Sequence, residues 1–242
     1  MTDLPTSATC RPTVIGVARI APMERAPLLV LISRAGEQLH GVDLRLSTPH
    51  ALAGHLDAAS GAPTVVVPLS LTPQRQLLQE IQVELARSRS GAIVANALGT
   101  DGTIAKALGR RLLDQGLDSP EDVCLVVAPF GWESEVEVSL SWAGMAIQEQ
   151  TPARIIPCRA DRLEEQVRHH RSRTRGHVVV VPWELVAGAF TVRLRETVQH
   201  LPVPVLDPVG PTREVAARLA AAYRQTLGRG RHHPWTTMAA TA

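Results

Sequence analysis

Residues 63–69 read PTVVVPL, and residues 177–183 read HVVVVPW. In both stretches a run of valines ends in proline, and a short loop and a helical pattern follow. Near-continuous β-branched runs of this length are typical of strands buried on both faces, as in a parallel sheet. The repeated tetrapeptide VVVP therefore predicts two central strands of an α/β fold, one in each half of the chain.

Two further pairs of landmarks support an internal repeat. The opening strands expected at 13–18 and 123–128 are separated by about the same distance as the two VVVP copies, and ALGT at 97–100 resembles PVGP at 208–211. Three landmarks at a near-constant offset indicate duplication of one unit, with a boundary near Gly116–Ser119. We predict two tandem domains at 13–117 and 120–228. The ends, 1–12 and 229–242, lack periodicity, and we expect them to be disordered.

Short β-branched runs alternate with helical-period stretches along almost the whole chain. Further strands are expected at 41–46, 91–97, 153–157 and 203–206. Five helices are expected, and each is marked by one apolar face: Leu28, Ile32, Ala35 and Leu39; Leu77, Leu78, Ile81 and Leu85; Ile104, Ala107, Leu108 and Leu112; Val136, Leu140, Gly144 and Ile147; Val215, Leu219 and Tyr223. This alternation predicts right-handed crossovers and a doubly wound parallel sheet in each unit.

The composition narrows the functional classes. A net charge of +2 over 242 residues is too small to indicate a nucleic-acid-binding protein. Three cysteines without a C-x-x-C spacing do not indicate a structural zinc site, an iron–sulfur cluster or a disulfide framework. The chain has no secretory signal pattern and no apolar run of membrane-spanning length. We therefore expect a cytoplasmic protein with no membrane partner.

The element order and several local patterns resemble the class II tetrapyrrole chelatases, specifically the CbiX-type sirohydrochlorin chelatases in their long, duplicated form. The resemblance covers about residues 13–228. Val65–Leu71 match the family's third strand, VVVPLxL, and residues 98–101 match the Leu-Gly-x-Asp turn before the last helix. The resemblance implies two chelatase-like domains facing each other across a cleft. It also implies a lyase of siroheme or cobalamin biosynthesis, with divalent cobalt, iron or nickel as the metal substrate.

The family's metal-binding positions are substituted in this chain. In the family, two histidines and an acidic residue receive the ion, and the corresponding positions here hold Arg19, Gln76 and Arg45, respectively. Imidazole and carboxylate are the usual ligands for such ions, whereas arginine has no lone pair to offer and stays charged. The equivalent positions of the second half offer no replacement: Pro129, Ile156 and Phe190. Ordinary metal insertion is therefore not expected, and we assign no metal site.

The substituted positions predict a cationic, hydrogen-bonding pocket. The carboxyl ends of parallel strands form the crevice in which ligands bind, and Arg19, Arg45 and Gln76 there would suit carboxylates or phosphate. Sirohydrochlorin carries eight carboxylates, so a tetrapyrrole or another polyanionic small molecule is the expected ligand. The alternative is that these arginines are solvated surface residues of a decayed site.

Other residues near the expected cleft are candidates for chemistry. Glu133 and Glu135 open the helix after the strand at 122–128, and Glu184 follows the second VVVP; each is a candidate general base or replacement ligand. Interaction with the helix dipole is the alternative role for Glu133 and Glu135. His50 follows the second strand and is the histidine expected nearest the cleft.

Two tryptophans in the second half complete the set of candidates. Trp132 and Trp183 are placed to flank the mouth of the cleft and stack on a flat ligand, with core packing as the alternative.

Three functions remain open from the sequence. The protein binds a tetrapyrrole as a chelatase-like enzyme or pseudoenzyme, or it is a non-catalytic partner of a histidine-bearing paralogue or another enzyme. The third is an enzyme repurposed to use the cleft carboxylates on an anionic metabolite.

Overall fold

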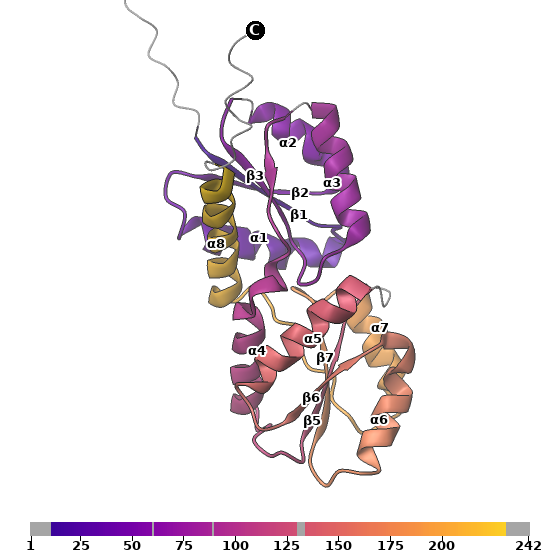
Figure 1. Cartoon of the computed structure of the whole chain (residues 1–242). Helices are drawn as coiled ribbons and strands as arrows, with labels where there is room; N and C mark the ends of the chain where they lie inside the picture. Colours follow the sequence, from indigo (N-terminus) through magenta and orange to yellow (C-terminus); the bar gives the residue numbers. More distant parts are fainter. Residues whose placement is uncertain (1–10, 60, 89, 130–133, 231–242) are drawn as a thin grey trace, which may run out of the picture.

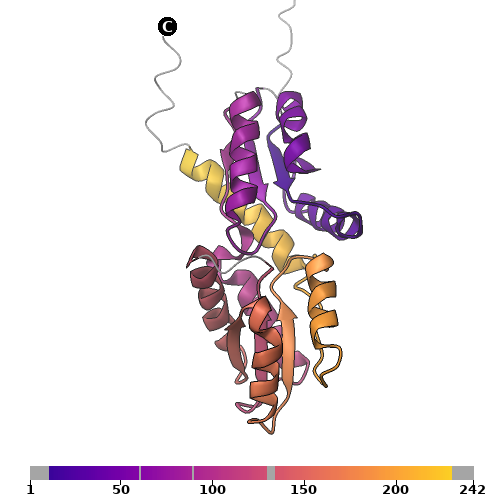
Figure 2. The ribbon, with the colours of Figure 1, turned by 90° about the vertical axis from the view of Figure 1, so that its right-hand side faces the viewer.

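The computed structural model describes residues 11–59, 61–88, 90–129 and 134–230. The chain forms two α/β halves stacked end to end, each built around a parallel sheet (Figure 1 and Figure 2). The strand order is β2-β1-β3-β4 in the first sheet and β6-β5-β7 in the second. The predicted α/β class with two tandem parallel sheets is confirmed. Most of the two ends expected to be disordered, at 1–10 and 231–242, lies outside the described residues.

The two sheets repeat one arrangement of strands. The first contains β1 (Thr13–Val17), β2 (Asp43–Ser47), β3 (Thr64–Pro68) and β4 (Ile93–Val94), and the second contains β5 (Val123–Val127), β6 (Arg154–Cys158) and β7 (Val178–Pro182). The register is equivalent, because Thr13 lies opposite Asp43 and Thr64 just as Val123 lies opposite Arg154 and Val178. The strand expected at 203–206 is reduced to one bridge between Val180 and Val205.

Eight α-helices connect these strands within the described residues. They are α1 (Pro22–Gly36), α2 (Leu52–Ala58), α3 (Arg75–Ser88), α4 (Thr103–Asp114), α5 (Ser134–Gln148), α6 (Leu163–Arg171), α7 (Ala189–Val198) and α8 (Arg213–Gly230). Short 3-10 turns precede three of them: η1 (Pro49–Ala51), η2 (Leu98–Asp101) and η3 (Ala160–Arg162). The five helices predicted from apolar periodicity are present as α1, α3, α4, α5 and α8. Helix α7 is the helical stretch predicted after the second VVVP, whereas α2 and α6 were not predicted.

Helices α1 and α5 show the duplication in their packing. Both follow the first strand of their half, and both bury four residues at the same relative spacing: Leu28, Leu31, Ile32 and Ala35 in α1, and Leu140, Ala143, Gly144 and Ile147 in α5. Pro22 starts α1 at a position where its missing N–H costs nothing. Glu24 accepts a hydrogen bond from the backbone N–H of Ala21 at 2.9 Å, which caps the same helix end.

The last helix of each sequence repeat packs against the other half. Helix α4 lies against α5, whereas α8 lies against α1 and β3 (Figure 1). The division at 116–119 thus describes the repeat in the sequence, while in space α4 belongs with the second half and α8 with the first. One hydrophobic cluster contains core residues of both sheets together with the buried faces of α4 and α8. Because α4 and α8 each pack against the half that does not contain the rest of their sequence repeat, the two halves share one hydrophobic core. This arrangement is called the exchange of α4 and α8 below.

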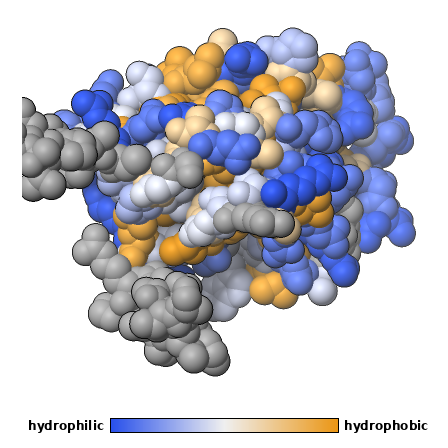
Figure 3. Space-filling model, turned by 90° about the horizontal axis from the view of Figure 1, so that it is seen from above, coloured by the Kyte–Doolittle hydropathy of each residue, from blue (hydrophilic) through white to orange (hydrophobic). Residues whose placement is uncertain are grey.

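The described surface at the end of the first half that is remote from the junction is mixed in character. Figure 3 views this end from above, and apolar side chains lie scattered there among hydrophilic ones. No helix among the described residues combines the length and apolar character needed to cross a membrane.

Candidate functional site

The loops that follow the central strands of both sheets meet at the junction between the halves. Residues after β1 (Ala18, Arg19), β3 (69–72), β5 (Pro129) and β7 (183–186) all line one cavity there. Because these loops leave the carboxyl ends of parallel strands, the junction is where this class of fold places its ligands. A cavity is therefore present at the junction where the sequence predicts the cleft.

Arg19 and Gln76 are brought together, and a third residue completes a network. The Arg19 guanidinium donates to the Gln76 Oε1 at 3.0 Å and to both carboxylate oxygens of Glu80, at 3.2 and 2.5 Å. Glu80 lies four residues after Gln76 on α3, and that spacing places both side chains on one helix face. The Arg19 side chain is 38% exposed. Its charge is therefore offset by Glu80 rather than free for an anionic ligand.

Arg45 lies apart from this network. It occupies the middle of β2, opposite Ile15, because the strand runs from 43 to 47 instead of 41 to 46. Its guanidinium donates to the Asp43 carboxylate at 2.8 Å and to the backbone carbonyl of His55 at 3.3 Å. Both arginines are thus paired with a carboxylate of the chain. These ion pairs offset the positive charge of the hydrogen-bonding pocket that the sequence predicts.

His50 is also outside the junction network. It lies in η1 just after β2, its side chain is exposed, and it lines neither of the two junction cavities described below. Of the candidates in the second half, Glu133 and Trp132 lie outside the described residues. Within those residues, no group of three histidine, cysteine, aspartate or glutamate side chains is arranged to hold a metal ion.

A small cavity of about 110 Å³ lies at the centre of the junction. Arg19 and Glu24 line it from the first half, and Trp183 and Glu184 line it from the second. Trp183, which the sequence placed at the mouth of the cleft, is only 1% exposed. The structure therefore favours the packing role for its indole ring over stacking on a ligand.

Glu184 is held in a partly buried position beside this cavity. Its Oε2 accepts a hydrogen bond from the Thr191 hydroxyl at 2.7 Å. Burial raises the pKa of Glu184, and the nearby charge of Glu24 raises it further, against the opposing effect of the Thr191 hydrogen bond. A carboxyl group of raised pKa in a cleft is suited to proton transfer.

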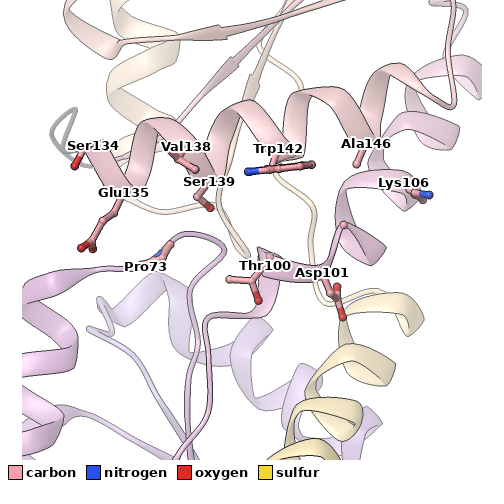
Figure 4. A pocket seen from close by; sticks show the side chains of 13 residues that line it. Pro73, Thr100, Asp101, Lys106, Ser134, Glu135, Val138, Ser139, Trp142 and Ala146 are labelled. Carbon is pink, nitrogen blue, oxygen red and sulfur yellow. The ribbon is translucent and has the colours of Figure 1, made fainter.

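A larger groove of about 610 Å³ opens on one side of the same junction. Helix α5 forms one wall with Glu135, Val138 and Trp142, and the loops carrying Pro73 and Thr100 form the other (Figure 4). Trp142 is 67% exposed and Val138 is 56% exposed. This groove therefore offers a flat, largely apolar surface to a ligand, with Glu135 at its rim.

Two charged residues of the groove, Asp101 and Lys106, are paired within the chain. Asp101 forms an ion pair with Arg218 of α8 at 2.6 Å, and Lys106 forms one with Glu149, just after α5, at 2.8 Å. Gly99 sets the position of the first-half wall, because a Cβ there would lie 2.2 Å from the backbone carbonyl oxygen of Leu71. Only glycine allows η2 to approach the 70–72 loop this closely.

Several residues at the junction were not found from the sequence. Glu80 was detectable in principle, since it stands at helical i+4 spacing from Gln76. Trp142 interrupts the polar face of its helix, which is a signal for an exposed apolar side chain. Glu24, Ser70 and Thr191 carried no such signal, because only the stacking of the two halves brings them together.

Comparisons with known proteins point to one fold. No family model matches the chain, and no curated protein matches it. Among solved structures, SirB from Bacillus subtilis with Fe3+ has a TM-score of 0.77 at 16% identity, covering 91% of this chain and 97% of that one. The sirohydrochlorin chelatase SirB from Bacillus subtilis subspecies spizizenii, in complex with cobalt, has a TM-score of 0.72 at 17% identity, covering 94% and 98%.

A third solved structure gives the same result. CbiX, described as the terminal enzyme for the biosynthesis of siroheme in denitrifying bacteria, has a TM-score of 0.63 at 17% identity, covering 89% of this chain and 98% of that one. Since the coverage is nearly complete on both sides, the likeness includes both halves and their stacking. The chain has the fold of the CbiX-type sirohydrochlorin chelatases.

Proposed function

We propose that the protein binds a tetrapyrrole, or a closely related planar ligand, at the junction of its two halves without inserting a metal ion. The chelatase fold supports the class of ligand. The observation that carries the proposal is the exposed Trp142 on an apolar groove of about 610 Å³, formed by elements from both halves.

The groove has the dimensions and the surface for a flat ligand. Its volume lies within the range of about 300–1,000 Å³ that is usual for small-molecule sites. An indole ring stacks favourably on another planar π-system, and Val138 and Ala146 extend the apolar wall. Because Lys106 and Asp101 are both paired within the chain, the groove suits the face of a macrocycle, with its carboxylates directed to solvent.

The residues at the family's metal-binding positions argue against insertion. Arg19 cannot donate a lone pair to an ion, and its guanidinium stays protonated at all physiological pH values. The Arg19–Gln76–Glu80 network also uses the Glu80 carboxylate, which is therefore not free to receive an ion. A metal substrate arriving there would have to break an ion pair and displace a cation.

Titration with sirohydrochlorin, followed by visible absorption, tests the binding proposal. We expect a saturable spectral shift, and we expect Trp142→Ala to weaken binding by about tenfold through loss of stacking. Val30→Ala is the matched control, because Val30 stands at the equivalent position of α1 and is 43% exposed. A flat titration of the unaltered protein at tens of micromolar, or equal affinity in Trp142→Ala, would contradict the proposal.

A non-catalytic partner subunit is the second candidate function. Val138, Trp142 and Met145 form an exposed apolar stripe on α5, with exposed fractions of 56%, 67% and 51%. Such a stripe is also typical of a surface that packs against another protein. If Trp142→Ala abolishes co-purification with a histidine-bearing chelatase while sirohydrochlorin leaves the spectrum unchanged, this second function replaces the first.

A further inference from the structure

The central cavity contains two buried donor groups without hydrogen-bond partners. The indole Nε1 of Trp183 and the Oγ of Ser70 have no partner among the described residues, and their side chains are 1% and 4% exposed. Leaving such a group unpaired in the interior is destabilising, because it has lost its hydrogen bond to water. Both residues line the cavity of about 110 Å³, so a bound group there would satisfy both.

The lining of the same cavity also provides acceptors. Glu184 accepts from the Thr191 hydroxyl at Oε2 and also from the Thr191 backbone N–H. A carboxylate has about four lone-pair sites, so the group can still accept from another donor. Glu24 contributes a second carboxylate, of which Oε2 caps α1. Its Oε1 is packed against Gly188, where a Cβ would lie only 1.9 Å away. Glycine at 188 therefore allows the Glu24 carboxylate to reach the cavity edge from the first half.

The combination of donors and acceptors selects the chemistry of the ligand. A carboxylate would satisfy Trp183 and Ser70 but would face the charges of Glu24 and Glu184. An ammonium group would satisfy the carboxylates but would leave the indole N–H unpaired. A primary carboxamide has a carbonyl oxygen for the two donors and an NH₂ group for Glu184.

We propose that this cavity is a binding site for a primary carboxamide group, with Trp183 and Ser70 donating to its oxygen and Glu184 accepting from its nitrogen. The volume of about 110 Å³ holds a group of a few heavy atoms. Access lies beside Arg19, which lines the cavity while its side chain is 38% exposed. The carboxamide proposal is argued only from the residues that line this cavity, and it does not depend on tetrapyrrole binding in the groove.

The side-chain N–H resonance of Trp183 reports on this site directly. In ¹H–¹⁵N spectra of the full chain, the indole signal that Trp183→Phe removes identifies it among the four tryptophans. Acetamide, acetate and methylammonium are titrated separately as small probes. We expect acetamide to shift the Trp183 signal saturably and at a concentration about tenfold lower than acetate or methylammonium requires.

Ser70→Ala is the decisive variant, because it removes one donor with little change in volume. We expect it to weaken acetamide binding by about five- to tenfold, with the remaining amide spectrum unchanged. Ser139→Ala, in the groove on α5, is the matched control and should bind acetamide like the unaltered protein. No shift of the Trp183 signal with any probe, equal affinity for acetate and acetamide, or an unaffected Ser70→Ala titration would each overturn the proposal.

Discussion

Arg19 illustrates how the partners of a side chain decide its role. Its guanidinium contacts Gln76 and both oxygens of Glu80, and the two charged side chains are 38% and 32% exposed. A pair this exposed contributes less than about 1 kcal/mol to stability, because water screens it. Its effect is on recognition instead, since it removes a free positive charge from the junction.

Removing Glu80 should release that charge. In Glu80→Ala, we expect Arg19 to bind inorganic pyrophosphate at least several-fold more tightly than in the unaltered protein, measured by calorimetry. The control is Glu165→Ala, which frees Arg162 of η3 from a comparable surface ion pair of 2.8 Å with Glu165 of α6. If both variants gain affinity equally, pyrophosphate binds to surface charge in general and not to the junction.

Glu184 should make the stability of the protein depend on pH. Burial raises its pKa in the folded state above the usual carboxyl value of 4.5, so the folded state binds more protons than the unfolded state just above that pH. Stability therefore falls as pH rises through this window. Glu184→Gln removes the effect and still accepts a hydrogen bond from Thr191.

We accordingly expect Glu184→Gln to raise the thermal midpoint relative to the unaltered protein at pH 7.5, and to raise it less at pH 4. Glu135→Gln, on the exposed end of α5, should show no such difference. A Glu184→Gln midpoint that differs from the unaltered one by the same amount at both pH values would rule out the raised pKa.

At the scale of single elements, the sequence was informative wherever burial follows a regular period. The central strands were placed within about a residue of their observed bounds, because continuous valine runs mark strands covered on both faces. Helix α6 was not predicted, since only Leu163, Val167 and His170 are buried in a strongly charged segment. The strand predicted at 41–46 is observed at 43–47, so the residue at its carboxyl end is Ser47. The prediction had placed Arg45 at that end, and it therefore assigned Arg45 to the pocket.

The contact between η2 and the 70–72 loop gives a test at this scale. In Gly99→Ala, the added methyl group would overlap the Leu71 carbonyl oxygen, and we expect a loss of about 1–3 kcal/mol in the free energy of unfolding, measured with urea. Gly54→Ala, in α2 with no neighbour within 4 Å, should instead stabilise the protein by about 0.5–1 kcal/mol. Equal effects at both glycines would contradict the close approach.

For the whole molecule, the exchange of α4 and α8 could not be predicted from the sequence. The internal repeat indicates two equivalent units, but periodicity does not say against which sheet an amphipathic helix packs. The same limit explains why the small central cavity was missed. Its residues come from loops of both halves, and their proximity depends on stacking that no local pattern encodes.

A core substitution in α8 tests the exchange. Leu219 is fully buried, and Leu219→Ala should cost about 2–5 kcal/mol. Because α8 packs on the first half, we expect amide exchange in β1 and β3 to accelerate at least as much as in β5 and β7. Leu113→Ala, on α4 and 40% exposed, is the control and should change little. Acceleration confined to β5 and β7 would show that α8 is stabilised by its own sequence half.

The rate of cobalt insertion into sirohydrochlorin tests most directly whether the Arg19–Gln76–Glu80 network excludes metal insertion. The absorbance of the macrocycle is followed after Co²⁺ is added, with and without the protein at a concentration that binds all of the tetrapyrrole. We predict that the protein leaves the rate at or below the uncatalysed value, because a paired arginine stands where a chelatase offers imidazole. Acceleration at catalytic amounts of protein, retained in Arg19→Ala, would contradict this prediction.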